Sequence, residues 1–284
     1  MSNPFTEFSN GLTSAVEKGG AGTVLVDARK RYPASGIVYT EDLILTADHV
    51  LRRDEDIKVV SSDGKEYSAT LAGRDPGSDL ALLRLAEKAL VPSKTSDDVK
   101  VGQLVLALGR PSTSGVQASW GIVIAIHGPA RTHHGGLLDS FIKSETTPYP
   151  GFSGGPLVNT EGEVLGLNTS GLSHGSSLTI PVKVAWRIAE SLAKHGTVKR
   201  GYLGVRTQPV EKGLLVMWLE EGGPAEKGGV LVGDILVSVN GQTVSDPDDL
   251  FAALSGDVVG KSIPVDVLRG GKPETVNVTA GERK

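Results

Sequence analysis

The chain has 284 residues, of which 29 are Lys or Arg and 33 are Asp or Glu, and it contains no cysteine. This length suits about two or three compact domains, and the formal net charge of −4 comes without the basic runs that attract a nucleic-acid backbone. The lack of cysteine excludes disulfides, a thiolate nucleophile and thiolate metal ligands. We therefore expect stability from apolar burial and no nucleic-acid partner.

No targeting segment is recognisable in the sequence. Residues Met1–Phe8 lack the basic start and apolar stretch of a secretion signal, and no window approaches the run of about 20 apolar residues that a membrane span needs. As written, the sequence predicts a cytoplasmic protein without an integral membrane segment. A periplasmic or other extracytoplasmic location is the alternative if the chain has been trimmed.

Residues 20 to 182 contain short apolar or alternating runs between Gly, Pro, Asp and Ser breaks. Such regularly interrupted runs are typical of the strands of an all-β barrel or sandwich. The predicted strands lie at residues 23–26, 37–39, 43–45, 57–60, 80–85, 104–108, 122–126 and 164–167. Residues 1–196 are therefore predicted to form one mainly β domain, with an N-terminal extension over about residues 1–20.

A helical pattern closes this region. Val184, Ile188 and Leu192 recur at helical spacing, and Gly196 stands where a helix would stop. We predict a helix over about residues 183–195, followed by a short polar connector at residues 197–201.

Residues 202–284 mix strands with a helix and are predicted to form a second, α+β domain. The helix is expected over about Pro247–Leu254, because Asp246 can cap its first turn and Pro247 suits its first position. Asn240-Gly241 predicts a tight turn. The predicted strands lie at residues 202–205, 213–218, 234–239, 263–268 and 275–278.

Three motifs contain the residue types that a serine nucleophile needs: Thr46-Ala47-Asp48-His49, Gly77-Ser78-Asp79-Leu80 and Gly151-Phe152-Ser153-Gly154-Gly155-Pro156-Leu157. A serine hydroxyl is a poor nucleophile until a base takes its proton and a third group orients that base, so we expect Ser153, His49 and Asp79 to meet in space. The order His, Asp, Ser is that of trypsin-like double barrels, whereas α/β-hydrolases and subtilisins have other orders. The plainer alternative is a glycine-rich turn at Ser153 and a solvated histidine at position 49.

Asp79 has competitors for the role of orienting group. Asp75 and Asp56 are the nearest candidates, but both are expected in turns or on the surface, whereas Asp79 directly precedes an apolar strand and can be buried. Asp48 is expected to have little effect on His49, because neighbouring side chains of an extended chain point in opposite directions.

These motifs, together with Arg200-Gly201-Tyr202-Leu203-Gly204-Val205 and the segment Pro224–Leu236, resemble the HtrA/Deg family of serine proteases. The resemblance extends from about residue 20 to the C-terminus. It implies a trypsin-like double six-stranded β-barrel followed by a small PDZ domain at residues 202–284. Phe152 and Asp48 depart from the family pattern, which often has Asn before the serine and a small apolar residue before the histidine.

The resemblance also implies a function. It predicts an ATP-independent serine endopeptidase that degrades unfolded or misfolded proteins through an acyl-enzyme. The predicted role is protein quality control. It further implies homo-oligomers, as trimers or multiples of trimers. A peptide-binding chaperone or holdase with the same fold and no turnover is the first alternative, and a small-molecule esterase is the second.

Carried over residue by residue, the resemblance makes Ser153 the nucleophile, His49 its general base and Asp79 the group that holds the imidazole. The backbone N–H groups of Gly151 and Ser153 would form the oxyanion hole, and Phe152 is expected to shape the leaving-group side of the cleft. In the second domain, a Φ-Gly-Φ loop would grip a peptide C-terminus while the peptide adds as a β-strand. This loop consists of Tyr202, Leu203, Gly204 and Val205. Its alternative is a structural strand with a glycine bulge.

The walls of the primary pocket indicate the substrate preference. The primary pocket of such a fold is walled by residues 146–150 and 167–171, and neither segment has an acidic side chain, which predicts cleavage after small or medium apolar residues.

His133-His134 lacks the partners of a metal site, and the aspartates at 246, 248 and 249 are expected to be helix-start charges rather than a calcium loop. We therefore expect no metal and no other cofactor.

Overall fold

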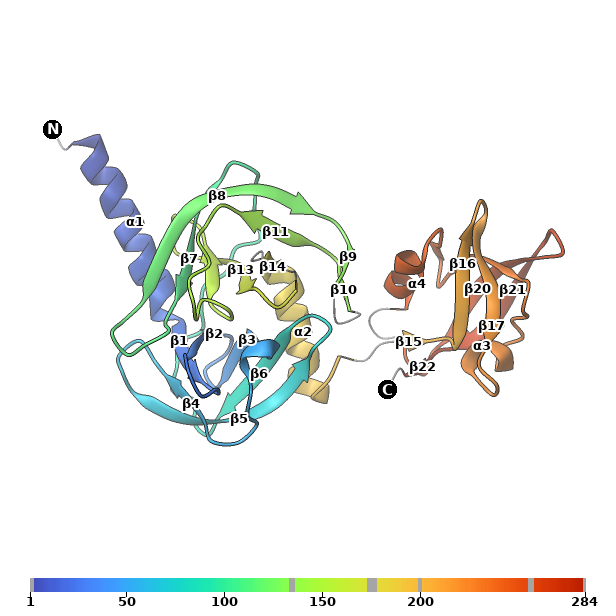
Figure 1. Ribbon diagram of the computed structural model, residues 1–284, viewed down its shortest axis with the longest axis horizontal. Helices are drawn as coiled ribbons and strands as arrows, with labels where there is room; N and C mark the ends of the chain where they lie inside the picture. The colour runs from blue at the N-terminus through green and yellow to red at the C-terminus, as the bar shows by residue number, and fades with distance from the viewer. Residues whose placement is uncertain (1–2, 133–135, 173–177, 199–200, 255–257, 283–284) are drawn as a thin grey trace. The chain divides into compact units, whose positions relative to one another are not determined.

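The structure of the protein, a computed structural model, describes residues 3–132, 136–172, 178–198, 201–254 and 258–282. It divides into two compact units, Met1–Val198 and Lys199–Lys284, each of which is described by itself (Figure 1). Among the described residues, no helix combines the length and the apolar character that a bilayer crossing requires.

Six antiparallel strands close the first barrel in the order β1-β2-β3-β6-β5-β4. They are β1 (Thr23–Asp27), β2 (Ala34–Val38), β3 (Leu43–Ala47), β4 (Ile57–Val60), β5 (Glu66–Asp75) and β6 (Leu80–Leu85). The barrel interior is filled by apolar side chains such as Leu45 and Leu82, which are fully buried. This packed interior fixes the strand ends, from which site residues project.

The second barrel has the same number of strands, closed in the order β11-β14-β13-β12-β7-β8. They are β7 (Leu104–Gly109), β8 (Gln117–His127), β11 (Phe141–Ser144), β12 (Pro156–Val158), β13 (Val164–Thr169) and β14 (Leu178–Pro181). A separate two-stranded sheet consists of β9 (Ala130–Arg131) and β10 (Leu137–Leu138). Two closed six-stranded barrels confirm the predicted fold of this part of the chain.

The predicted closing helix is α2 (Val182–His195), which packs against β5 and β6 of one barrel and β13 and β14 of the other. Val184, Ile188 and Leu192 form its buried face. The helix ends at Gly196, whose φ of 72° lies in the left-handed region that glycine adopts without strain. One amphipathic helix thus joins the two barrels.

A second helix of this unit, α1 (Pro4–Ala21), was not predicted. The Asn3 side chain caps it by accepting a hydrogen bond from the Phe5 N–H at 3.0 Å, and Pro4 occupies its first turn. Gly19 lies where a Cβ would come within 2.8 Å of the Leu108 side chain, so glycine lets this helix approach the second barrel closely.

Arg110 ties α1 to both barrels from a buried position. Its Nε donates to the Thr23 carbonyl at 2.8 Å and its Nη2 to the Gly20 carbonyl at 3.1 Å, while its backbone N–H donates to Ser35 Oγ at 2.8 Å. Burial lowers the pKa of the Arg110 guanidinium, and its hydrogen bonds run to backbone carbonyls, one of them at the end of α1.

The second unit is an α+β domain built on one sheet of order β16-β17-β18-β20-β21, with β19 paired to β18. Its strands are β15 (Gly201–Tyr202), β16 (Val205–Val210), β17 (Gly213–Leu219), β18 (Ile235–Val239), β19 (Gln242–Thr243), β20 (Ser262–Arg269), β21 (Lys272–Thr279) and β22 (Gly281–Glu282). Its helices are the short α3 (Pro224–Lys227) and α4 (Pro247–Ala253).

Two local predictions are confirmed in this unit. Asp246 caps α4 by accepting from the N–H groups of Asp248 and Asp249 at 2.7 and 2.9 Å, and the Asp249 side chain completes a capping box. Asn240 and Gly241, with φ of 52° and 76°, make the expected tight turn between β18 and β19.

The role of Arg110 can be tested by Arg110→Met, which keeps the aliphatic volume and removes the donors. We expect the free energy of unfolding, measured by urea denaturation with far-UV circular dichroism, to fall by about 1.5–3 kcal/mol, because buried carbonyls lose a charged donor. The matched control is Arg84→Met, whose partly exposed side chain bonds Asp42 and should cost less than about 1 kcal/mol. Equal losses in the two variants would contradict the assigned role.

Candidate active site

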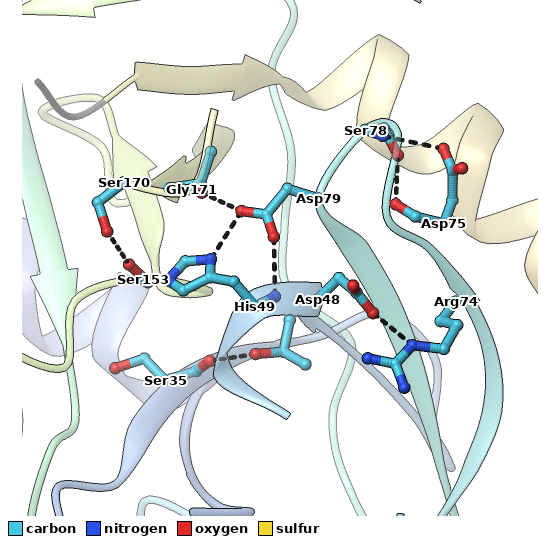
Figure 2. A network of polar contacts seen from close by, with 12 residues as sticks. Ser35, Asp48, His49, Arg74, Asp75, Ser78, Asp79, Ser153, Ser170 and Gly171 are labelled. Carbon is cyan, nitrogen blue, oxygen red and sulfur yellow. Dashed lines mark hydrogen bonds and ion pairs between the residues drawn. The ribbon is translucent and has the colours of Figure 1, made fainter. Parts of the chain in front are cut away.

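The three residues singled out in the sequence come from both barrels of the first unit. His49 lies in a 3₁₀ turn (Asp48–Val50) directly after β3, and Asp79 directly precedes β6. Ser153 lies in the turn that precedes β12 of the second barrel. Figure 2 shows that the structure brings these three segments together.

His49 and Asp79 form a two-point contact. The ring Nδ1 of His49 lies 2.8 Å from Asp79 Oδ2, and the His49 backbone N–H donates to Asp79 Oδ1 at 2.8 Å. The Thr169 hydroxyl of the second barrel also donates to Asp79 Oδ2. With 2 % of its side chain exposed against 23 % for His49, Asp79 is the buried member of the pair. The carboxylate therefore fixes the ring and leaves its Nε2 edge free to face the cleft.

Asp79 reaches this position through an unusual backbone conformation. Its φ of 56° lies in the left-handed region, which a residue other than glycine rarely adopts. Two hydrogen bonds hold it there: its N–H donates to the Pro76 carbonyl at 3.2 Å, and its carbonyl accepts from the Asp48 N–H at 3.0 Å. Strain of this kind persists only where the surroundings fix it, and it is concentrated at functional sites.

Ser153 is held from the first barrel. The Ser35 hydroxyl donates to the Gly151 carbonyl at 2.7 Å, and the Ser35 N–H donates to the Ser153 carbonyl at 3.2 Å. Gly154, with φ of 87°, lies so close to the Ser35 carbonyl that a Cβ would come within 2.1 Å of it. The glycine after the serine is therefore required by a close backbone approach.

The Ser153 hydroxyl and the His49 ring line the same pocket. The Ser153 hydroxyl lies 3.1 Å from the Ser170 hydroxyl and forms a hydrogen bond with it. Within the described part of the chain, it forms no hydrogen bond with His49. A nucleophile and its base are often not in tight contact in a ligand-free site, so this arrangement is compatible with a serine–histidine pair.

The two backbone N–H groups expected to form the oxyanion hole have no acceptor among the described residues. Within the described residues, the N–H groups of Gly151 and Ser153 have no hydrogen-bond acceptor, whereas the neighbouring N–H groups of Phe152 and Gly154 donate to the carbonyls of Tyr149 and Asn168. Gly151 has φ of 88°, a conformation that favours glycine. A pair of free N–H groups beside a hydroxyl can bind a developing oxyanion.

The expectation for Asp48 rested on an extended chain and was wrong in its geometry, because residues 48–50 form a 3₁₀ turn. The Asp48 carboxylate instead accepts from Arg74 Nε at 2.7 Å, and Arg74 Nη1 also contacts Asp54 at 3.2 Å (Figure 2). These carboxylates raise the pKa of the Arg74 guanidinium. Asp48 is thus neutralised by a residue that sequence reasoning missed.

The competing aspartates lie elsewhere. Asp75 is buried at the end of β5 and accepts from the Ser78 N–H at 3.1 Å, which makes it a turn carboxylate. Asp56 is exposed. Among the described residues, no three His, Asp or Glu side chains are arranged to hold a metal ion. His133 and His134 lie outside the described residues.

Phe152 is among the residues that line the pocket, and its place on the leaving-group side stays a prediction. The residue is 2 % exposed, and its side chain packs in the core of the second barrel. Gly109 makes room for it, since a Cβ at that position would lie 2.5 Å from the ring atom Cδ1. Tyr149 packs edge-on against the same ring, with centroids 5.5 Å apart. Phe152 therefore anchors the turn that carries Ser153.

In the second unit, the candidate loop lies at the start of an edge strand. Tyr202 belongs to β15, Leu203 is buried, Gly204 has φ of 74°, and Val205 begins β16 at the sheet edge. The left-handed φ of Gly204 favours glycine at this position, and a Cβ there would also come within 2.9 Å of the Glu220 carboxylate.

Comparison with protein families gives one match in each unit. Residues 34–167 match a trypsin-like peptidase domain, and residues 201–280 match a PDZ domain. Among curated proteins, the chain is 36 % identical over 274 residues to a Rhizobium meliloti protein named probable periplasmic serine endoprotease DegP-like, covering 89 % of this chain and 54 % of that protein. A Brucella suis protein of the same name is 37 % identical over 267 residues, at 86 % and 52 % coverage. The chain thus spans about half the length of these relatives.

Two solved structures have a similar fold over nearly the whole chain. A serine endoprotease from Yersinia pestis is 30 % identical with a TM-score of 0.80, covering 96 % of this chain and 98 % of that one. The HtrA-type protease AlgW, solved with a decapeptide, is 27 % identical with a TM-score of 0.83, at 96 % and 99 % coverage.

The anchoring by Phe152 predicts a large effect of truncation. We expect Phe152→Ala to lower the free energy of unfolding by about 3–5 kcal/mol, because the buried ring leaves a cavity beside Gly109. Tyr149→Ala is the control, since that ring is 48 % exposed and its loss should cost less than about 2 kcal/mol. Urea denaturation monitored by circular dichroism measures both, and a Phe152→Ala loss no larger than that of Tyr149→Ala would contradict the anchoring.

Proposed function

The chain belongs to the HtrA-type family of serine proteases, and from that premise we propose that it is an ATP-independent serine endoprotease acting on unfolded or misfolded polypeptides in protein quality control. The observation that carries the proposal is that His49, bonded through its ring to the buried Asp79, lines the same pocket as Ser153. The free N–H groups of Gly151 and Ser153 are the donors that would stabilise the oxyanion. An extended backbone, which unfolding exposes, is the substrate that such a cleft accepts.

In the proposed reaction, the Ser153 hydroxyl exchanges its bond to Ser170 for one to His49 and attacks the carbonyl carbon of the scissile bond. His49 takes the hydroxyl proton, while Asp79 holds the ring and stabilises the imidazolium without becoming protonated. The N–H groups of Gly151 and Ser153 hold the oxyanion, each contributing about 2.7–4 kcal/mol to transition-state stabilisation.

Collapse of the tetrahedral intermediate completes the first half of the reaction. His49 gives its proton to the leaving amine, the C–N bond breaks, and the acyl group remains on Ser153. Water then attacks the ester with His49 again as the base, and the carboxylic acid product leaves with the Ser153 hydroxyl restored. The primary pocket between residues 146–150 and 167–171 has no acidic side chain, which supports cleavage after small or medium apolar residues.

We propose that the second unit binds peptide C-termini at the loop from Tyr202 to Val205. The carbonyls of Leu203 and Gly204 accept from the N–H groups of Ala225 and Glu220, each at 2.8 Å. Because a trans peptide places N–H opposite C=O, the N–H groups of Gly204 and Val205 point the other way and can receive a carboxylate. The peptide would then extend along the free edge of β16, beside α4.

An exposed apolar stripe supports self-association, for which we propose trimers or multiples of trimers. Trp120, Ile122, Ile124 and Ile126 alternate along the outer face of β8 and are 60 %, 39 %, 45 % and 44 % exposed. Phe8 of α1 packs edge-on against Trp120, with centroids 6.4 Å apart, and extends the stripe. Apolar patches of this kind on a protein surface mark interaction sites.

We propose an extracytoplasmic location, the alternative to the cytoplasmic one that the sequence favours as written. The support is the naming of the Rhizobium meliloti and Brucella suis relatives as periplasmic. A chain without cysteine folds equally well in an oxidising compartment.

The endoprotease proposal is tested by Ser153→Ala. We expect casein cleavage to fall by at least about 10⁴-fold, with peptide binding retained and fluorophosphonate labelling at Ser153 lost, because the nucleophile is removed. Ser114→Ala, an exposed serine away from the site, serves as the control and should keep full activity. Peptide binding without casein cleavage in both parent and Ser153→Ala would favour the holdase, and turnover confined to activated esters would favour the esterase.

Self-association is tested by sedimentation velocity. We expect the double variant Trp120→Ser/Ile124→Ser to sediment as a smaller species than the parent, because the apolar stripe loses its contact area. Val91→Ser, a residue that is 82 % exposed and lies off the stripe, should leave the sedimentation coefficient unchanged. A monomeric parent, or a double variant that sediments like the parent, would contradict the assignment.

A further inference from the structure

The pocket that holds Ser153 and His49 has one basic wall. It has a volume of about 360 Å³, and beside the nucleophile it is lined by Tyr149 and Pro150 of the second barrel. From the first barrel, Arg29, Arg31 and Tyr32 line it, all from the loop between β1 and β2. Two guanidinium groups thus border the space in which a bound substrate must lie.

Among the residues that the structure describes, no carboxylate neutralises the charge of this wall. Arg29 gives its donors to the backbone carbonyls of Tyr32 and Pro33, and Arg31 is exposed. In the described part of the chain, neither arginine forms an ion pair, whereas nearby Arg53 is paired with Asp27 at 3.0 Å. Burial and, to a smaller extent, the repulsion of Arg52 lower the pKa of the Arg29 guanidinium.

The position of the loop determines which part of a substrate it meets. The primary pocket, which takes the side chain before the scissile bond, is expected between residues 146–150 and 167–171. The strand end at Thr169–Gly171 lies against Asp79 and His49. The basic loop instead packs behind Gly151, where a Cβ would come within 2.9 Å of the Pro33 carbonyl. Ser170 of that strand end and the two arginines line the same pocket, and we assign the arginine side, behind Gly151, to the chain after the scissile bond.

We infer that Arg29 and Arg31 form a subsite for acidic side chains on the leaving-group side of the scissile bond. This inference rests on the proposed endoprotease function and adds a substrate preference to it: polypeptides with Asp or Glu within the first three positions after an apolar residue. Arg29, held by backbone carbonyls, shapes the loop and supplies fixed charge, while Arg31 is free to contact the substrate carboxylate.

The test compares three internally quenched peptides that have blocked ends, Val before the scissile bond, and Glu, Gln or Lys at the second and third positions after it. We expect kcat/KM to be about threefold to tenfold higher for the Glu peptide than for the Gln peptide at low ionic strength, with the Lys peptide lowest, and the difference to shrink in high salt. Mass spectrometry of the products verifies that all three are cut at the same bond.

Two matched variants locate the effect. Arg31→Glu should bring the Glu-to-Gln ratio below one, whereas Lys30→Glu, the same charge change at a neighbouring residue that does not line the pocket, should keep the ratio above one. Binding of the same peptides to Ser153→Ala, measured by fluorescence anisotropy, should show the same order of affinities without turnover. This second readout tests the subsite independently of the rate of chemistry.

The outcomes separate this inference from the proposed function. Equal kcat/KM for the Glu and Gln peptides in the parent, or the same fall in ratio for Arg31→Glu and Lys30→Glu, would overturn the basic subsite while the endoprotease stands. No cleavage of any peptide together with no fluorophosphonate labelling at Ser153 would overturn the endoprotease and, with it, the subsite.

Discussion

The burial of the Asp79 carboxylate is the constraint on which the site depends. A carboxylate removed from water is costly unless every oxygen is bonded, and here the partners come from both barrels. The ring and backbone of His49 bond it from the first barrel, and the Thr169 hydroxyl from the second. His49 bonds both carboxylate oxygens from within the first barrel, and docking of the second barrel adds the Thr169 hydroxyl as a further donor. The left-handed backbone of Asp79 is held separately, by its hydrogen bonds to the Pro76 carbonyl and the Asp48 N–H.

The turn that carries Ser153 also depends on contacts between the two barrels. Its turn belongs to the second barrel, yet Ser35 of the first barrel binds the carbonyls of both Gly151 and Ser153. The Phe152 ring holds the turn from behind, inside the core of the second barrel. Because these contacts use the carbonyls of the turn, its two key N–H groups stay available for a substrate oxygen. Arg29 and Arg31 line the same pocket as His49 and Ser153, so the proposed acidic-side-chain subsite adjoins the reacting groups.

Sequence reasoning found the elements whose signal is local. Continuous apolar runs such as Leu80–Leu85, and caps such as Asp246, correspond directly to observed elements. It missed β5, in which polar and apolar residues alternate, and the short barrel strands β11, β12 and β14. The helix α1 was missed although Asn3-Pro4 is a start signal, because its glycines lower helix propensity and are explained only by close packing on the barrel. The Asp48–Arg74 pair joins residues 26 apart in sequence, so no local pattern reveals it. The buried Phe152 and the basic wall likewise depend on the tertiary fold.

Proton NMR of the His49 imidazole tests the central claim most directly, because it reports on the Nδ1–H that Asp79 is expected to hold. A bonded, buried Nδ1–H should give a strongly downfield resonance that exchanges slowly with water. We predict that this resonance is present in the parent and in Ser153→Ala, unaffected by Asp48→Asn, and lost in Asp79→Ala. An Nδ1–H that exchanges freely in the parent, or one whose resonance survives Asp79→Ala, would contradict it.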